Sequence, residues 1–209
     1  ERVLNKRPSE INPLFCTDCE REAKRLKFSA EMEMGMLFAD IRGSTPLAES
    51  MGSLEFSKMI DRFYTETTHV LMHSYAVIDK LAGDQVSGYY LPGLVGKDFA
   101  KASVEAAQDL LRVVGYGEPE GPWAPVGVGI NTGEAVFGYV GSTGGVMEIT
   151  ALGDVANVAA RLASQAAAGE ILLSDSTVKH AGVDTSKLEK RELELKGKRE
   201  AQNVWVMRV

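Results

Sequence analysis

The chain has 209 residues, of which 44% are hydrophobic and 25% charged, and this composition fits one well-buried globular domain with appendages. The formal net charge of −6 does not favour binding to nucleic acid or to an anionic membrane surface, so we expect no nucleic-acid partner. An anionic substrate would instead need a local cluster of Lys and Arg side chains.

No apolar run approaches the roughly 20 residues that are needed to cross a bilayer, and no signal peptide is visible. We therefore expect a cytoplasmic domain. The chain starts at Glu1 rather than at Met, which leaves open a longer parent chain with an upstream sensor domain or a membrane attachment.

Residues 1–33 differ from the rest of the chain and are predicted to form an N-terminal arm. Thr17–Glu20 matches a capping box and Glu20–Lys27 contains good helix formers, so we expect a short charged helix there. Cys16 and Cys19 form half of the ligand set that a structural zinc site needs. The chain has no other cysteine, so two reduced thiols are the favoured interpretation and a site shared between two chains is the alternative.

A strand around Met36–Ala39 is predicted to end at Asp40, and a Gly-Ser-Thr turn comes after it. Thr45 is the expected N-cap of the next helix, with Pro46 at its first position. A helix N-terminus attracts anions, and a carboxylate beside it suits a divalent cation. This stretch therefore suggests a binding site for a metal-bound polyphosphate. Taken alone, Asp40 is better explained as the end of a strand or a helix cap.

The remaining elements alternate between strands, hairpins and helices, which predicts one α+β domain over residues 34–209. We expect a ferredoxin-like or palm-type mixed sheet with a βααββαβ core, helices packed on it and a C-terminal hairpin extension. The predicted elements are a helix capped by Ser53 and reaching about His73, a hairpin over Tyr75–Leu91, a helix over Asp98–Val114, strands at Val126–Asn131 and Glu134–Val140 joined by a Thr132-Gly133 turn, a strand at Met147–Ala151, a helix over Val155–Gln165 capped by Asp154, and strands at Glu170–Leu173, Glu192–Leu195 and Asn203–Met207.

Asp84 lies with Gly83 in the tight turn of the predicted hairpin. If this hairpin pairs beside the first strand, Asp40 and Asp84 reach the same end of the sheet. Two such carboxylates can bridge a pair of Mg²⁺ ions and stabilise an in-line displacement at phosphorus. The alternative for Gly83-Asp84 alone is ordinary turn chemistry.

Three segments of the chain resemble the signature segments of class III nucleotidyl cyclases, the catalytic domain of adenylate and guanylate cyclases. They are Phe38–Thr45 (Phe-Ala-Asp-Ile-Arg-Gly-Ser-Thr), Lys80–Asp84 (Lys-Leu-Ala-Gly-Asp) and Thr150–Leu162 (Thr-Ala-Leu-Gly-Asp-Val-Ala-Asn-Val-Ala-Ala-Arg-Leu). They occur in the family's order, and the resemblance runs from about Glu33 to Val209. Each segment alone is a weak signal, whereas the set is specific.

The resemblance implies a role for each matching position. Asp40 and Asp84, with Ile41 beside them, match the binding site of two Mg²⁺ or Mn²⁺ ions. Lys80 and Thr150 match the pair that reads the base, in a subgroup with Thr where many adenylate cyclases have Asp. Further positions match the ribose-orienting and transition-state pair (Asn157 and Arg161), the lysine near the terminal phosphates (Lys198, with Lys196 as the other candidate) and the substrate-binding turn (Ile41, Arg42, Gly43, Ser44 and Thr45).

The chemistry of the base-reading pair favours adenine. A lysine can donate to a ring nitrogen that is an acceptor in adenine and carries a hydrogen in guanine, and a threonine hydroxyl can accept from the exocyclic amine. Asn157 and Arg161 are four residues apart on a predicted helix, so both side chains lie on one stripe. Taken singly, Lys80 and Arg161 are also explained as solvated surface residues and Thr150 as an ordinary strand threonine.

The sequence therefore predicts an adenylate cyclase that converts ATP to 3′,5′-cyclic AMP and pyrophosphate. The resemblance implies a head-to-tail homodimer in which one chain gives the metal aspartates and the other gives the base-reading, ribose and transition-state residues. The alternatives are a guanylate cyclase and a catalytically silent nucleotide-binding or dimerisation module. A diguanylate cyclase is disfavoured because its Gly-Gly-Asp/Glu-Glu-Phe signature is absent. The Thr150 subgroup also suggests bicarbonate responsiveness as a hypothesis.

Overall fold

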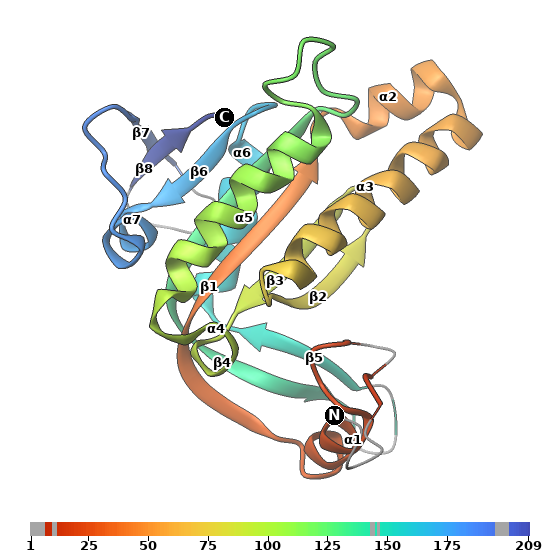
Figure 1. The fold of residues 1–209 in the computed structure, drawn as a ribbon, viewed down its shortest axis with the longest axis vertical. Coiled ribbons are helices and arrows are strands. Elements are labelled where there is room, and N and C mark those ends of the chain that lie inside the picture. The colour runs from red at the N-terminus through yellow and green to blue at the C-terminus, as the bar shows by residue number, and fades with distance from the viewer. Residues whose placement is uncertain (1–6, 10–11, 143–144, 146, 195–200) are drawn as a thin grey trace.

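The computed structural model describes residues 7–9, 12–142, 145, 147–194 and 201–209. Among these residues an eight-stranded sheet has the order β2-β3-β1-β4-β6-β8-β7, and β5 pairs with β4 (Figure 1). The predicted mixed α+β class is confirmed, because β4 and β6 are parallel whereas the other pairs are antiparallel. The strands are β1 (Ser29–Ile41), β2 (Val77–Ala82), β3 (Gln85–Tyr90), β4 (Val126–Gly141), β5 (Met147–Leu152), β6 (Ile171–Ser174), β7 (Glu189–Leu193) and β8 (Gln202–Met207).

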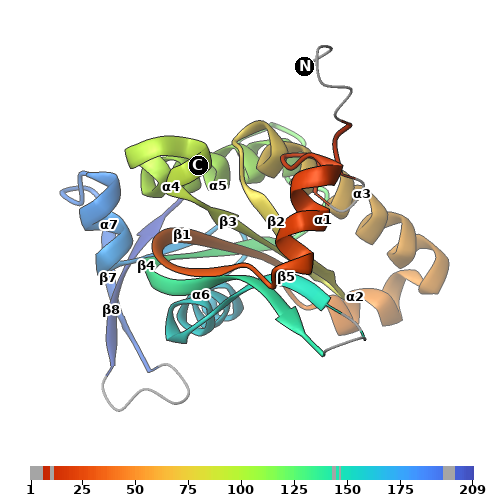
Figure 2. The same cartoon turned by 90° about the horizontal axis from the view of Figure 1, so that it is seen from below.

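The helices cover both faces of the sheet. Figures 1 and 2 show α3 and α5 on one face and α6 on the other. Strand β1 alternates accordingly: Leu37 and Ala39 join the apolar cluster of α3 and α5, whereas Met36 and Phe38 join the cluster of α6. The helical elements are α1 (Thr17–Arg25), α2 (Ser44–Met51), α3 (Ser53–His73), α4 (Pro92–Val95), the 3₁₀ turn η2 (Gly96–Asp98), α5 (Phe99–Val114), α6 (Asp154–Gln165) and α7 (Asp175–Ala181).

Strands β1 and β4 form one long antiparallel ladder. The predicted turn at Thr132-Gly133 is wrong, because these residues pair with Gly35 and Met34 of β1 and β4 runs through them without a break. Strand β1 likewise begins at Ser29, earlier than the predicted strand, because its first residues pair with the far half of β4. A pairing partner thus overrides the local turn preference of Thr-Gly.

The predicted helix caps are wrong in detail. Glycines rather than Thr45, Ser53 and Asp154 hold the N-cap positions of α2, α3 and α6. Gly43 precedes α2 with φ of 65°, a left-handed conformation that glycine adopts at little cost, so the helix begins at Ser44. Helix α1 is capped by the Cys16 sulfur, which accepts from the Cys19 backbone N–H at 3.2 Å, and not by the Thr17 hydroxyl.

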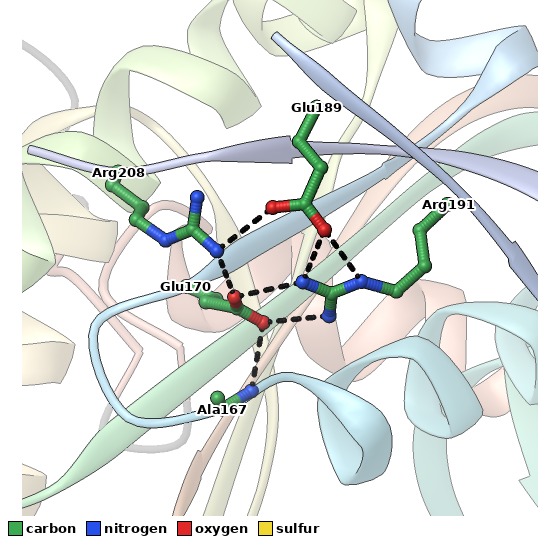
Figure 3. A network of polar contacts seen from close by, with 5 residues as sticks. All are labelled: Ala167, Glu170, Glu189, Arg191 and Arg208. Carbon is green, nitrogen blue, oxygen red and sulfur yellow. Dashed lines mark hydrogen bonds and ion pairs between the residues drawn. The ribbon is translucent and has the colours of Figure 1, made fainter.

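The C-terminal strands are held to the body of the domain by a buried carboxylate. Glu170 precedes β6 and accepts two hydrogen bonds of 3.0 Å from Arg191 of β7 and one of 2.5 Å from Arg208 (Figure 3). The Ala167 backbone N–H donates to the same carboxylate, and Glu189 bridges the two arginines. Strand β7 begins and ends earlier than the predicted Glu192–Leu195, and the predicted Lys196–Lys198 turn lies outside the described residues.

Within the described ranges, no helix combines the length and the hydropathy that crossing a lipid bilayer requires.

Candidate active site

Asp40 and Asp84 lie at the same end of the sheet, as the sequence predicts. Strand β3 pairs with β1 so that Asp40 stands opposite Gln85, the residue directly after Asp84. The Ile41 backbone N–H donates to the Asp84 carbonyl oxygen at 3.0 Å, which ties the end of β1 to the hairpin turn. The Tyr64 hydroxyl of α3 donates to the Gly83 carbonyl oxygen at 2.8 Å and holds the same turn from the other side.

The surroundings of Asp40 are those of a partly buried carboxylate beside a second one. Burial raises the pKa of Asp40, the Arg42 guanidinium lowers it, and the Asp84 charge raises it again. Arg42 forms an ion pair with Asp40 and donates to the Ser164 carbonyl oxygen of α6 at 2.6 Å. Gln85 Nε2 donates to Asp40 Oδ2 at 3.4 Å, a contact that the position of Gln85 in the sequence did not indicate.

An open groove of about 940 Å³ lies beside this turn. Its wall includes Asp84 and Gly83 from the hairpin and Ser44 and Thr45 from the start of α2, while α3 supplies the facing side. The structure thus brings Asp84, one of the two predicted metal ligands, to the same groove as Ser44 and Thr45, two of the predicted substrate-binding residues. Arg42 belongs to the same turn, and its side chain is engaged with Asp40 and α6.

Lys80 and Thr150 both lie where the β2–β3 hairpin packs against β5. Lys80 Nζ lies 3.1 Å from Glu148 of β5, and Glu148 and Thr150 are two residues apart, so they share one face of that strand. Glu148 is also the main cause of the raised pKa of Lys80. Thr150 Oγ1 lies 3.4 Å from the hydroxyl of Tyr89, a β3 residue.

Helix α6 carries Asn157 and Arg161. Its buried side packs on β4, where Gly129 leaves room for the helix backbone: a methyl group there would lie 2.1 Å from the Ala163 nitrogen. Asn157 is exposed and Arg161 is half-buried, one helical turn apart. The pair therefore stands on the accessible stripe of α6, as its spacing predicts.

Sequence reasoning missed three residues of this region. Gln85 contacts Asp40, Tyr89 contacts Thr150 and Glu148 contacts Lys80, and each contact depends on how strands pack together rather than on a local pattern. Lys198 lies outside the described residues.

Cys16 and Cys19 lack further metal ligands in the part of the chain that the structure describes. That part contains no group of three or more His, Cys, Asp or Glu side chains placed to hold an ion. Within the described ranges neither Cys16 nor Cys19 forms a disulfide bond. The zinc alternative stays a prediction about a site completed by a second chain.

Comparison with known proteins identifies the family. The model of the adenylate and guanylate cyclase catalytic domain matches residues 27–208. The chain therefore belongs to this family, the class III nucleotidyl cyclases. The predicted fold agrees with solved members: the guanylyl cyclase Cya2 superposes with a TM-score of 0.73 at 26% identity, covering 85% of this chain and 92% of that one. The adenylyl cyclase CyaB from P. aeruginosa gives 0.71 at 25% identity, covering 87% and 97%.

Curated relatives carry the name adenylate cyclase. One from Mycobacterium tuberculosis is 32% identical over 171 residues, which cover 79% of this chain and 37% of the relative. One from Anabaena cylindrica is 28% identical over 214 residues, which cover 97% of this chain and 41% of the relative. The chain thus spans about two fifths of the length of these relatives.

Proposed function

We propose that this domain is an adenylate cyclase that converts ATP to 3′,5′-cyclic AMP and pyrophosphate. The observation that carries the proposal is the meeting of Asp40 and Asp84, from separate segments, at one end of the sheet beside an open groove. The names of the curated relatives support ATP as the substrate.

The residues at this end fit a pair of divalent cations. Carboxylate oxygens are hard ligands, and Mg²⁺ sites combine one or two carboxylates with substrate phosphates and water. Asp40 and Asp84 would hold the ions, with Ile41 contributing its backbone carbonyl oxygen. Burial and the neighbouring Asp84 charge raise the pKa of Asp40, and a bound cation would offset both effects. When bound, such ions would make the ribose 3′-hydroxyl more acidic and neutralise the pyrophosphate that leaves.

The other groups would bind the nucleotide and stabilise charge. Lys80 would donate to an adenine ring nitrogen and Thr150 would accept from the exocyclic amine. Asn157 would orient the ribose, and the Arg161 guanidinium would stabilise the charge that develops on the reacting phosphoryl group. Ser44, Thr45 and the backbone of Ile41, Arg42 and Gly43 would line the phosphates, with Lys198 as the candidate for the terminal phosphates.

We further propose that each site is shared by two copies of the chain. Support comes from the positions along the sheet: Tyr89, which contacts Thr150, stands opposite Met36, four residues before Asp40 on β1. That separation is about 13 Å along the strand. A second copy, related head to tail, would bring its own Thr150, Asn157 and Arg161 to face this copy's Asp40 and Asp84.

GTP is the competing substrate, because a solved relative of similar fold, Cya2, is a guanylyl cyclase. Incubation with ATP or GTP and Mg²⁺ or Mn²⁺, followed by chromatography of the products, decides between them. We expect cyclic AMP and pyrophosphate from ATP, and none from the Asp84→Asn variant. Cyclic GMP as the main product would select the guanylate cyclase. Nucleotide binding without either product would select the silent module.

A further inference from the structure

The Arg42 side chain joins the predicted metal carboxylate to the C-terminal end of helix α6. One terminal nitrogen of its guanidinium forms the ion pair with Asp40, and the other donates to the Ser164 carbonyl oxygen at 2.6 Å. Asp40 belongs to β1 and Ser164 to the last turn of α6, so the two partners lie on separate elements. The guanidinium is therefore a bridge between the end of β1 and the end of α6.

The contact with α6 satisfies a group that the helix itself leaves unpaired. The last four carbonyl groups of an α-helix have no partner within the helix, and the negative end of the helix dipole favours a cation there. Because α6 ends at Gln165, the Ser164 carbonyl is one of these groups. The Ser164 hydroxyl donates to the Arg161 carbonyl oxygen at 2.8 Å, so the bridge ends in the turn that follows Arg161.

The bridge is largely enclosed by the protein. The Asp40 side chain is 14% exposed and the Arg42 side chain 21%. Arg42 Nε is buried and has no hydrogen-bond partner among the described residues, so the two terminal nitrogens carry the contacts of this side chain. A carboxylate at such a place is costly without a counter-ion, and Arg42 provides one.

Both carboxylate oxygens of Asp40 have a partner within the protein. Arg42 pairs with Oδ1, and Gln85 Nε2 lies 3.4 Å from Oδ2. A divalent cation needs a carboxylate oxygen as its ligand, and a guanidinium beside that oxygen repels the cation. A cation at Asp40 therefore competes with Arg42.

We propose that Arg42 is a positioning residue that couples the loading of divalent cations at Asp40 to helix α6. Without cations, its guanidinium holds Asp40 and fixes the last turn of α6 to β1. When a cation is bound, the guanidinium leaves Asp40, and this turn of α6 loses its tie to the strand. The turn adjoins Arg161, the proposed transition-state residue. The inference rests on the proposed metal role of Asp40.

Binding of Mn²⁺ in the absence of nucleotide tests the competition. Electron paramagnetic resonance measures the free ion at a series of total Mn²⁺ concentrations, for the wild type and for Arg42→Gln. We expect the variant to bind Mn²⁺ about three- to tenfold more tightly, because the competing guanidinium is gone. Equal or weaker binding by the variant would overturn the proposal.

Arg25→Gln is the matched control. Arg25 forms an exposed ion pair with Glu22 at 2.6 Å on α1, which precedes the start of β1, whereas Asp40 lies near the end of that strand. This variant loses the same charge, but at a distance over which salt screens it, so we expect the Mn²⁺ affinity of the wild type. A gain equal to that of Arg42→Gln would overturn the inference, since it would show an effect of net charge alone.

Hydrogen exchange in the wild type tests the coupling without a substitution. Exchange of the backbone amides of residues 161–165 is compared with and without Mg²⁺. We expect Mg²⁺ to speed this exchange about threefold or more, because the last turn of α6 loses its tie to β1. Exchange in this turn that Mg²⁺ slows or leaves unchanged would contradict the coupling.

A direct contact between the Arg42 side chain and the nucleotide phosphates would give a different result. It would make Arg42→Gln bind 3′-deoxy-ATP more weakly while the variant binds Mn²⁺ alone as the wild type does. That pair of results would overturn the proposal and assign the guanidinium to the substrate.

The proposed function is judged separately. A wild type that binds no Mn²⁺ contradicts the metal site and, with it, the coupling. A wild type that forms cyclic AMP, with a Mn²⁺ affinity equal to that of Arg42→Gln, contradicts the coupling alone.

Discussion

Glu170→Gln should destabilise the domain strongly at neutral pH. Glu170 is 6% exposed, and hydrogen bonds from Arg191 and Arg208 bring its pKa from 4.5 to about 2 (Figure 3). The difference between these two pKa values corresponds to about 3 kcal/mol of folding free energy at pH 7. The glutamine keeps the shape of the side chain but removes the charge that both arginines contact.

The pH dependence gives this prediction its sign. Because the folded pKa lies below the unfolded value, the contribution is complete above the unfolded pKa of 4.5 and is lost as the pH falls toward about 2. The difference between wild type and variant should therefore shrink to about half near pH 3.

Urea denaturation at a series of pH values measures the difference, and at pH 7 the melting temperature should fall by about 6–12 °C. Glu192→Gln is the matched control, since Glu192 is an exposed residue of β7 for which the described part of the chain shows no ion pair. We expect a change within about 0.5 kcal/mol there. An effect of Glu170→Gln no larger than that of the control, or a difference that grows on acidification, would refute the reasoning.

Two further predictions concern the site. Gly129→Ala should lower the free energy of unfolding by about 3 kcal/mol and reduce nucleotide turnover, because the added methyl group would lie 2.1 Å from the backbone of α6. Gly93→Ala is the control: a methyl group there meets no atom within 4 Å, so stability should be unchanged or slightly higher. Equal unfolding free energies for the two variants would contradict this prediction. Arg42→Gln should raise the pKa of Asp40 further above its ordinary value of 3.8, because the guanidinium lowers it in the wild type. Carboxyl NMR titration measures that pKa, and a fall in the variant would contradict the account. The sign for stability is opposite to that of Glu170: with its folded pKa raised, Asp40 disfavours folding at neutral pH, and this cost is relieved on acidification.

The features predicted from the sequence are those with strong local patterns. The Gly83-Asp84 turn between two apolar runs predicts a hairpin, and the structure shows this hairpin as β2 and β3. Strand β3 pairs with β1, the strand that contains Asp40. The spacing of Asn157 and Arg161 specifies one helix stripe. These elements position the candidate site.

Features that depend on distant partners were not predictable in the same way. The local sequence Thr132-Gly133 predicts a turn, and these residues belong to a strand only because they pair with β1. Tyr89 comes near Thr150, and Glu148 comes near Lys80, only because β5 packs beside the hairpin. Helix α7 could have been found, since Ser174 caps it with its side chain and Asp175 occupies its first turn.

The central claim is that two copies of the chain form one catalytic site that cyclises ATP. Asp40→Ala and Asn157→Ala should each be inactive alone, because each removes a different half of every site. Mixed after dissociation, they should form heterodimers with one intact site and recover about a quarter of the wild-type cyclic AMP production. No recovery, with heterodimers shown to form, would contradict the shared site and with it the proposed assembly.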